Sequence, residues 1–261
     1  MLVEEWQSRL STFASRVDWP RRVFVIESCE STQDQAAALF QEHQTDLAVF
    51  TLHQTNGRGR LGRSWQQQSS MTQSPLGVAV TFALSSQRYD AKWLPIRAAF
   101  AAFATCYQIG HPPNESIKIK WPNDIVTSDG KKLGGILVEK PASLNALLVG
   151  IGLNVEHSPA DLPAHLSATS LRAIATRPVT TLDVAESLIF ELARKVAVDA
   201  PTLERLWPVV DALTGSTRTF LHNNQSYTGV VMSISPTEHI KLRTDAGIVT
   251  LPAASTTLVK D

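Results

Sequence analysis

The stretch from residue 47 to residue 84 decides the fold of this chain. It begins with LAVFTL (47–52), continues as HQTNGRGRLGRSW (53–65) and, after a polar stretch, ends with LGVAVTFAL (76–84). The first and last segments are apolar, which predicts two core strands. The glycine- and arginine-rich segment between them is therefore predicted to be a loop that joins these strands.

Glycine and arginine alternate in this loop, and the alternation predicts an anion-binding site. Glycine has no Cβ, so successive backbone N–H groups can converge on one oxyanion. Guanidinium groups match the paired oxygens of phosphates and carboxylates and stay charged at any working pH. Trp65 ends the run with a flat face suited to a base or a cation. The residues concerned are Gly57, Arg58, Gly59, Arg60, Gly62 and Arg63.

We compared two other interpretations of the loop with the sequence, a nucleic-acid-binding segment and a Walker phosphate-binding loop. A nucleic-acid-binding segment stays open, although the position between core strands favours a small-molecule anion. A Walker phosphate-binding loop is excluded, because the pattern Gly-x4-Gly-Lys-Ser/Thr is missing.

Length and charge limit the architecture and the partners. The 261 residues suffice for one large domain, or for a main domain of about 200 residues with a small appendage. An apolar fraction of 43% supports a full core. Because 24 basic and 24 acidic residues cancel, no overall field draws the chain to nucleic acid or anionic lipid.

The cysteine and hydropathy patterns favour a cytoplasmic location, and the histidine pattern gives no sign of a metal centre. Only Cys29 and Cys106 occur, far apart, which is typical of a reducing compartment. The seven histidines form no His-x3-His pair that would predict a metal centre. Glu4 and Glu5 stand where a secretory signal would be apolar, and no run approaches the roughly 18 apolar residues of a membrane span.

Periodicity along the chain predicts alternating helices and strands. The predicted helices are 2–17, one ending near residue 42, 91–109, 181–198 and 202–213, and the further strands are 22–27, 117–121, 132–139 and 146–155. Ser31 with Asp34 three residues on predicts a helix cap, which is a purely structural interpretation of Ser31 and Thr32. The N–H groups at such a helix start also suit a polar or anionic ligand.

A hairpin is predicted around Asp129-Gly130, a pair typical of tight turns. It would bring Asp124 and Lys132 close together on neighbouring antiparallel strands. A structural ion pair is one interpretation of this approach. The adjacent Gly134-Gly135 favours a functional one, because glycine weakens a strand unless something must approach its backbone.

The pattern changes after Thr214-Gly215. Short strands are predicted at 217–221, 226–234, 238–244, 247–251 and 254–259. Five short strands in under 50 residues predict a small barrel, so we divide the chain into residues 1–213 and 214–261.

Four segments together resemble the ordered signature of biotin protein ligases. They are residues 57–65 (GRGRLGRSW), 120–124 (KWPND), 132–139 (KLGGILVE) and 150–154 (GIGLN). The resemblance runs from about residue 22 to the C-terminus. It implies an α+β fold in which helices flank a mixed β-sheet similar to class II aminoacyl-tRNA synthetases, followed by a small SH3-like β-barrel. Residues 1–213 would then form the catalytic biotin- and ATP-binding domain.

The resemblance also implies an activity. Biotin would attack the α-phosphate of ATP to give biotinyl-5′-adenylate, and a lysine of a biotin carboxyl carrier protein would then take the biotinyl group. ATP and Mg²⁺ would be required, and the enzyme would be a monomer or homodimer. Some family members carry an N-terminal DNA-binding domain. Only about 20 residues precede the first predicted strand, so we expect no such domain and no DNA partner.

Site residues follow from the motifs by similarity. The implied catalytic residues are Lys132, Arg60 and Asp124, of which Asp124 is also a candidate for positioning Mg²⁺. The residues expected to face biotin are Ser31, Thr32, Gln33, Gln54, Gly57, Arg58, Gly59, Arg60, Lys132, Gly134 and Gly135. Those expected to face the adenylate are Arg58, Arg60, Arg63, Trp65, Asn123 and Asn154.

The chain departs from the family pattern in three places. Ser31-Thr32-Gln33 stands where Ser-Thr-Asn is common, and Val78-Ala79-Val80 replaces a pattern that usually includes an asparagine. Gln66–Gln73 separates the tryptophan from a Ser-Pro that usually follows it almost directly. We expect this polar stretch to be mobile.

Three rival functions remain. A lipoate or octanoate protein ligase would share the fold, but such enzymes generally lack the repeated Gly-Arg pattern. A non-catalytic biotin or nucleotide sensor is disfavoured by the presence of Lys132 and Arg60. RNA binding through the loop is the third.

Overall fold

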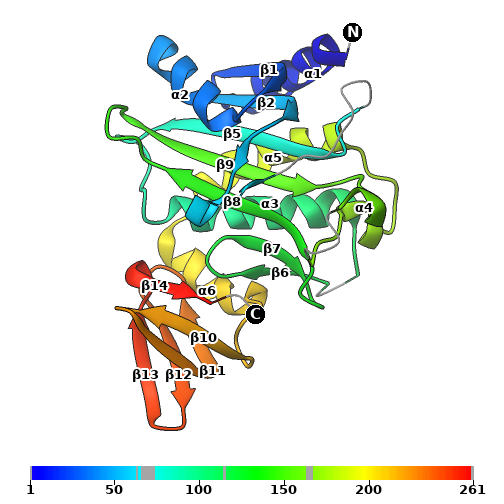
Figure 1. Cartoon of the computed structure of the whole chain (residues 1–261). Coiled ribbons are helices and arrows are strands. Elements are labelled where there is room, and N and C mark those ends of the chain that lie inside the picture. The colour runs from blue at the N-terminus through cyan, green and yellow to red at the C-terminus, as the bar shows by residue number, and fades with distance from the viewer. Residues whose placement is uncertain (1, 63, 66–73, 114–115, 163–166, 260–261) are drawn as a thin grey trace.

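A computed structural model describes residues 2–62, 64–65, 74–113, 116–162 and 167–259 of the chain (Figure 1). Arg63 and the polar stretch Gln66–Gln73 lie outside the described residues, so their expected roles are not addressed by the structure.

A seven-stranded mixed sheet forms the main body, as expected (Figure 1). Its spatial order is β1 (Arg22–Cys29), β2 (Leu47–Gln54), β5 (Gly77–Ser85), β9 (Ala146–Asn154), β8 (Lys132–Glu139), β7 (Asp124–Thr127) and β6 (Ile117–Lys120). Strands β1 and β2 are parallel and every other neighbouring pair is antiparallel.

Helices cover both faces of this sheet. They are α1 (Leu2–Val17), α2 (Thr32–His43), α3 (Leu94–Gly110), the short α4 (Leu171–Ile174), α5 (Thr181–Val196) and α6 (Ala200–Val210). Phe40 of α2 packs on Leu47, Val49 and Leu148 in a small core on one face. The main core lies on the other face, against α1, α3 and α5.

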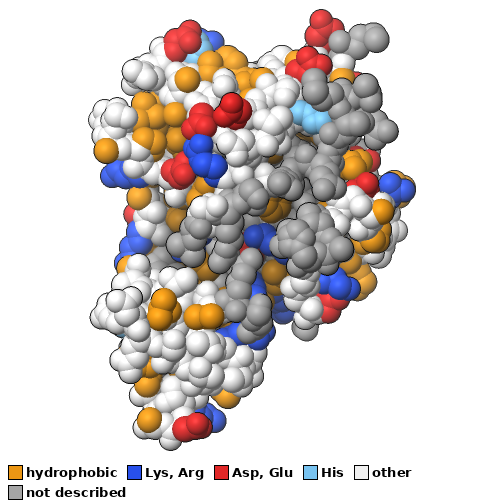
Figure 2. Space-filling view, viewed as in Figure 1, with side chains coloured by type: hydrophobic (Ala, Val, Ile, Leu, Met, Phe, Trp, Pro, Cys, Tyr) orange, Lys and Arg blue, Asp and Glu red, His pale blue; other side chains and the backbone are white. Residues whose placement is uncertain are grey.

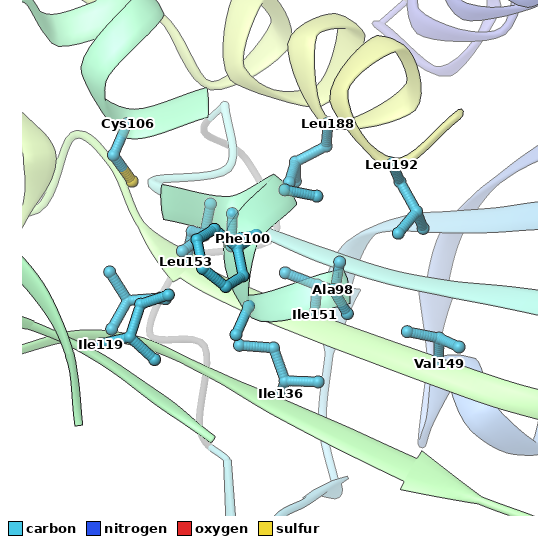
Figure 3. Close-up of a cluster of buried hydrophobic side chains, with 14 of the residues drawn as sticks. Ala98, Phe100, Cys106, Ile119, Ile136, Val149, Ile151, Leu153, Leu188 and Leu192 are labelled. Atoms are coloured by element: carbon cyan, nitrogen blue, oxygen red, sulfur yellow. The ribbon is translucent and has the colours of Figure 1, made fainter. Parts of the chain in front are cut away.

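Strand β9 divides its side chains between these two faces. Val149, Ile151 and Leu153 point toward α3 and α5, where they meet Phe100 and Leu188 (Figure 3). Because side chains alternate along a strand, the residues between them face the side of α2. Both intervening residues, Gly150 and Gly152, are glycines, and the polar motifs lie on this side of the sheet.

The arginine loop, residues 54–65, leaves the end of β2 on that side. Its described part contains β3 (Gly57–Arg58), a 3₁₀ turn (Arg60–Gly62) and β4 (Ser64–Trp65). Gly57 pairs with Trp65 and Arg58 with Ser64, so the loop folds back as a small hairpin.

The C-terminal residues form a five-stranded antiparallel sheet (Figure 1). Its strands are β10 (Thr217–His222), β11 (Gln225–Ser235), β12 (His239–Thr244), β13 (Gly247–Pro252) and β14 (Thr256–Leu258), in the order β13-β12-β11-β10-β14. The five short strands are confirmed. A 3₁₀ turn (Ala253–Ser255) carries the chain from one edge to the other, and no ladder between β13 and β14 closes a barrel among the described residues.

This C-terminal sheet contacts the KWPND segment of the main body. Trp121 is buried, and its indole Nε1 donates to the Pro236 carbonyl at 3.0 Å. Its ring lies 6.2 Å from that of Phe220 on β10. The same segment supplies Asn123 and Asp124, so the two sheets meet beside the polar motifs. Within the described residues, no helix has the length and apolar character needed to cross a membrane.

Candidate functional site

A buried polar cluster lies where α2 begins. Ser31 is the N-cap residue, as predicted, and accepts a hydrogen bond from the Gln33 N–H at 3.3 Å. Asp34, the expected second member of the capping pair, binds Arg58 instead. The backbone N–H and the hydroxyl of Thr32 both donate to Gln54 Oε1, at 2.9 and 3.1 Å. Thr81 of β5 donates to the Thr32 hydroxyl at 2.8 Å. The cluster therefore joins the helix start to the beginning of the arginine loop.

Gly57 is required by the close approach of this cluster to the loop. A Cβ at this position would lie 2.2 Å from Gln54 Nε2 and 2.3 Å from the Trp65 carbonyl oxygen. Only glycine lets the two arms of the loop and Gln54 pack together.

Gln33 continues the cluster over β9. Its Nε2 donates to the Leu137 carbonyl at 3.2 Å, and a Cβ on Gly150 would come within 2.8 Å of the same nitrogen. Gly150 thus makes room for the side chain of Gln33. Gln33 Oε1 is buried and has no hydrogen-bond partner among the described residues, which leaves an acceptor available to a ligand N–H.

Lys132 and Asp124 form a half-buried ion pair on neighbouring strands. Lys132 Nζ lies 2.6 Å from Asp124 Oδ1, as the hairpin predicted. Gly135 lies under the pair, since a Cβ there would be 3.2 Å from Nζ and 3.3 Å from Oδ1. The Lys132 backbone is held by the Ser167 carbonyl and the Thr169 N–H.

Trp65 lies directly on β9. A Cβ on Gly152 would be 2.4 Å from Trp65 Cε2, so the indole occupies the space that a side chain would fill. Lys132 Nζ lies 5.7 Å from the centre of the indole ring, within cation–π range. The arginine loop and the lysine hairpin therefore meet above one glycine surface, made of Gly135, Gly150 and Gly152.

Two asparagines border this surface. Asn123 Oδ1 accepts from Arg60 Nη1 at 3.5 Å, and Asn123 Nδ2 donates to the Ile136 carbonyl at 2.7 Å. Asn154 is buried, and its Nδ2 donates to the Thr169 carbonyl at 3.0 Å. Arg60 is thus linked to the KWPND segment, and Asn154 to the segment that holds Lys132.

Arg58 points toward two carboxylates. Its Nη1 and Nη2 donate to the two oxygens of Asp34 at 2.7 and 2.8 Å, and Nη2 also donates to Glu139 Oε2 at 3.3 Å. The hydrogen bonds from Arg58 to Asp34 raise the pKa of the guanidinium above its ordinary value, so it remains charged. Figure 2 shows acidic and basic side chains in contact on this face beside α2.

Most predicted site residues lie around the glycine surface and the start of α2, and three residues differ from the prediction or lie outside the described residues. Arg58 contacts Asp34 and Glu139, and Arg63 lies outside the described residues. Gly134 packs on the core side of β8, where an added Cβ would lie 2.4 Å from Leu153 Cδ2.

Five residues of the site were not predicted as site residues from the sequence, namely Asp34, Thr81, Glu139, Gly150 and Gly152. Thr81 lies in an apolar strand that gives no sign of a polar role. Glu139 and Gly152 stand inside recognised motifs, but the motifs alone assigned no contact to either residue.

Among the described residues, the site coincides neither with a metal-binding cluster nor with the pocket between α1 and β1. The described residues contain no group of three or more His, Cys, Asp and Glu side chains that could hold a metal ion. A surface pocket of about 430 Å³ lies instead between α1 and β1, lined by residues such as Ser11, Asp18 and Arg21. None of the predicted site residues lines it.

The fold and the site define a class of protein. A mixed sheet with a glycine surface, bordered by an arginine-bearing loop, a lysine–aspartate pair and a polar helix start, is an α+β domain suited to an anionic small molecule. A family model described as the biotin/lipoate A/B protein ligase family matches residues 25–156, half of the chain. The chain belongs to this family.

Individual relatives agree with the family. The chain is 32% identical over 165 residues to the bifunctional ligase/repressor BirA of Bacillus subtilis. The alignment covers 61% of this chain and 49% of the relative. It is 32% identical over 151 residues to a biotin–acetyl-CoA-carboxylase ligase of Mycobacterium tuberculosis, covering 58% and 54% of the two chains. The chain thus spans about half the length of these curated relatives.

Solved structures share the fold over more of the chain. The biotin protein ligase of Aquifex aeolicus in complex with biotin and ATP aligns with a TM-score of 0.74 at 22% identity, over 92% of this chain and 100% of that one. A Leishmania major biotin protein ligase in complex with biotinyl-5-AMP aligns with a TM-score of 0.61 at 20% identity, over 90% and 100%. At such identities the likeness establishes the fold.

Proposed function

We propose that this protein is an ATP-dependent biotin ligase that joins biotin to a lysine of a biotin carboxyl carrier protein. The observation that carries the proposal is the meeting of Trp65 and Lys132 above the glycine surface. Family membership supports it, and so do relatives named as biotin ligases.

In the first step a biotin carboxylate oxygen attacks the α-phosphorus of ATP, a P–O bond forms, and pyrophosphate leaves with the electron pair of the broken P–O bond. The carboxylate is already ionised near neutral pH, so no base is needed. The obstacle is the repulsion between two anions, which the chain must hold together. Lys132 and Arg60 supply positive charge beside the glycine surface, where it is partly shielded from water.

The buried cluster at the start of α2 suits the uncharged end of biotin. Thr32 and Gln54 present hydroxyl and amide groups, and the Gln33 carbonyl oxygen can accept a ureido N–H. Gly135 and Gly150 let the side chains of Lys132 and Gln33 lie close to the sheet backbone, where both can face the ligand. The remaining residues proposed for biotin contact are Ser31, Gly57 and Gly59. Of the other two residues expected from the motifs, Gly134 faces the core side of β8 and Arg58 is bound by Asp34 and Glu139.

The adenylate would lie at the other end of the glycine surface. Trp65 offers an aromatic face for adenine, and Arg60, Asn123 and Asn154 offer polar groups at its border. Arg63 belongs to this proposal from sequence only. In the second step the ε-amino group of the acceptor lysine attacks the acyl carbon, AMP leaves with the acyl–oxygen bond pair, and the amine releases a proton.

Mg²⁺ would enter with ATP as part of the substrate. Magnesium in such sites takes mainly phosphate and water oxygens with one or two protein carboxylates. Asp124 is the carboxylate nearest to Lys132 in the described part of the site, and its Oδ1 holds that lysine. Its other oxygen is suited to a magnesium-bound water or to the ion itself.

Further parts of the proposal concern organisation and location. Residues 1–213 would form the catalytic domain and residues 214–261 a separate C-terminal unit. Both cysteines are free, and burial raises the pKa of Cys106 to about 12, which keeps that thiol protonated and unreactive. A reducing, cytoplasmic location fits free thiols.

Pyrophosphate release with a panel of acids tests the proposal. Biotin with ATP and Mg²⁺ should produce pyrophosphate, whereas lipoate and octanoate should give little. Release with lipoate or octanoate but not biotin would support a lipoyl-type ligase, and no release with any acid would support a non-catalytic binding protein.

A further inference from the structure

We propose that Asp34 and Glu139 are positioning residues that fasten the arginine loop over the site by binding Arg58. The inference rests on the proposed function, because it names what holds that site closed. We call Asp34, Glu139 and Arg58 the carboxylate clamp.

The clamp joins three separate elements. Asp34 lies in the first turn of α2, Glu139 ends β8, and Arg58 lies on β3 of the arginine loop. The sequence separations are 24 residues from Arg58 to Asp34 and 81 to Glu139. A bidentate contact with Asp34 fixes the orientation of the guanidinium as well as its distance.

The clamp spans the buried cluster that we assign to biotin. Gln33, next to Asp34, bonds to the carbonyl of Leu137, two residues before Glu139. Arg58 bridges the same two elements nearer to solvent. Closing the clamp therefore holds the loop against α2 and β8, beside this cluster.

Arg58 and Arg60 of the arginine loop have different partners. Arg58 is bound by two carboxylates, whereas Arg60 Nη1 donates to the amide oxygen of Asn123. A cation already paired with two anions adds little attraction for a phosphate, so we assign Arg58 to anchoring the loop.

Exposure makes the clamp weak enough to open. The side chains are 41% exposed for Arg58, 58% for Asp34 and 36% for Glu139. Ion pairs that exposed are screened by salt. Opening would let biotin and ATP enter, and closing would retain the reactive adenylate.

The test is the double variant Asp34→Asn with Glu139→Gln, which keeps the side-chain shapes and removes both charges. Trypsin cleavage after Arg58 or Arg60 without substrates should become at least about threefold faster, and release of preformed biotinyl-adenylate should accelerate similarly. The KM for biotin should rise while kcat changes less. High salt should speed loop cleavage in the parent protein but not in the double variant.

A matched control exists within the chain. Arg9 of α1 is held by Asp183 at 3.1 Å and Glu186 at 2.8 Å, and Asp183 also lies in the first turn of its helix, α5. Asp183→Asn with Glu186→Gln removes an equivalent clamp and should change neither loop cleavage nor adenylate release.

Two results would overturn the inference. Unchanged loop cleavage and adenylate release in the double variant would mean that Asp34 and Glu139 do not fasten the arginine loop. A lower KM for biotin would mean that the carboxylates compete with substrate for Arg58. Loop cleavage needs no activity, so it tests the clamp even if the parent protein makes no adenylate, a result that would instead refute the proposed function.

Discussion

The ammonium of Lys132 lies 2.6 Å from Oδ1 of Asp124, across two neighbouring antiparallel strands. The contact fixes the lysine at the edge of the glycine surface and beside Trp65. A lysine held in this way meets its substrate without first being ordered, which is the advantage of preorganised charge in a site that joins two anions.

Replacing Lys132 by alanine should therefore reduce adenylate formation by at least about 100-fold, comparable to the loss of a charge-stabilising group in other enzymes. Lys131→Ala is the matched control, since Lys131 is the preceding residue and pairs with Asp129 in the exposed turn. Pyrophosphate release and circular dichroism of both variants provide the measurement. Near-normal turnover in Lys132→Ala would refute the assignment.

Gly152 provides the surface on which Trp65 packs. In Gly152→Ala the new methyl group would overlap the indole and displace it, so adenylate should dissociate about fivefold faster or more, the equivalent of roughly 1 kcal/mol of lost stacking. In a Trp65→Ala background the same glycine change should have little further effect. Additive effects of the two changes would mean that Gly152 acts independently of the tryptophan.

Trp121 ties the C-terminal sheet to the KWPND segment. Trp121→Phe removes the donor to the Pro236 carbonyl and should lower the free energy of unfolding by about 1–3 kcal/mol. Trp207→Phe is a suitable comparison, because Trp207 is equally buried but its Nε1 has no partner among the described residues. Urea denaturation should show the larger loss for Trp121→Phe, and equal losses would contradict a role for this hydrogen bond.

His157 should make the protein less stable in mild acid. The ring is buried, and the cost of desolvating its charged form lowers its pKa below 6.5 despite the nearby Asp161 and Glu156. The unfolded chain, with the ordinary pKa, then binds a proton that the folded chain does not. Stability should consequently fall as pH decreases from about 6.5 toward the folded pKa, and His157 should have no effect above about pH 7.5.

The variant His157→Gln checks this linkage. Melting temperatures measured between about pH 5 and 8 should fall less steeply on the acid side for the variant than for the parent protein. Parallel curves would place the acid sensitivity in other groups.

Local patterns predicted the strands of the two larger sheets, every helix except the short α4, and part of the site. The Asp129-Gly130 turn predicted the hairpin and the neighbouring strands that carry Asp124 and Lys132. The observed register pairs Asp124 with Gly135 and contains a bulge between Ile125 and Val126, so spacing alone did not fix the contact between the two side chains. Helix ends were less accurate. Helix α3 begins at Leu94 instead of residue 91, and α6 begins at Ala200 instead of residue 202, because proline is accommodated in the first turn of each. Helix α6 also ends at Val210 instead of residue 213.

Contacts between distant motifs could not be predicted in this way. Trp65 packed on Gly152 and Arg58 bound by Glu139 join segments more than 80 residues apart. Neither partner carries a local signal for the other, because a glycine in a strand or a glutamate at its end has many structural explanations. Such pairings depend on the order of strands in the sheet.

The most direct test of the account is native mass spectrometry of the protein incubated with biotin, ATP and Mg²⁺. We predict a bound mass equal to biotinyl-adenylate, formed with release of pyrophosphate and absent in Lys132→Ala. A spectrum with only unmodified biotin or ATP bound, or with no ligand, would contradict the claim that the arginine loop and Lys132 form one site that joins these two substrates.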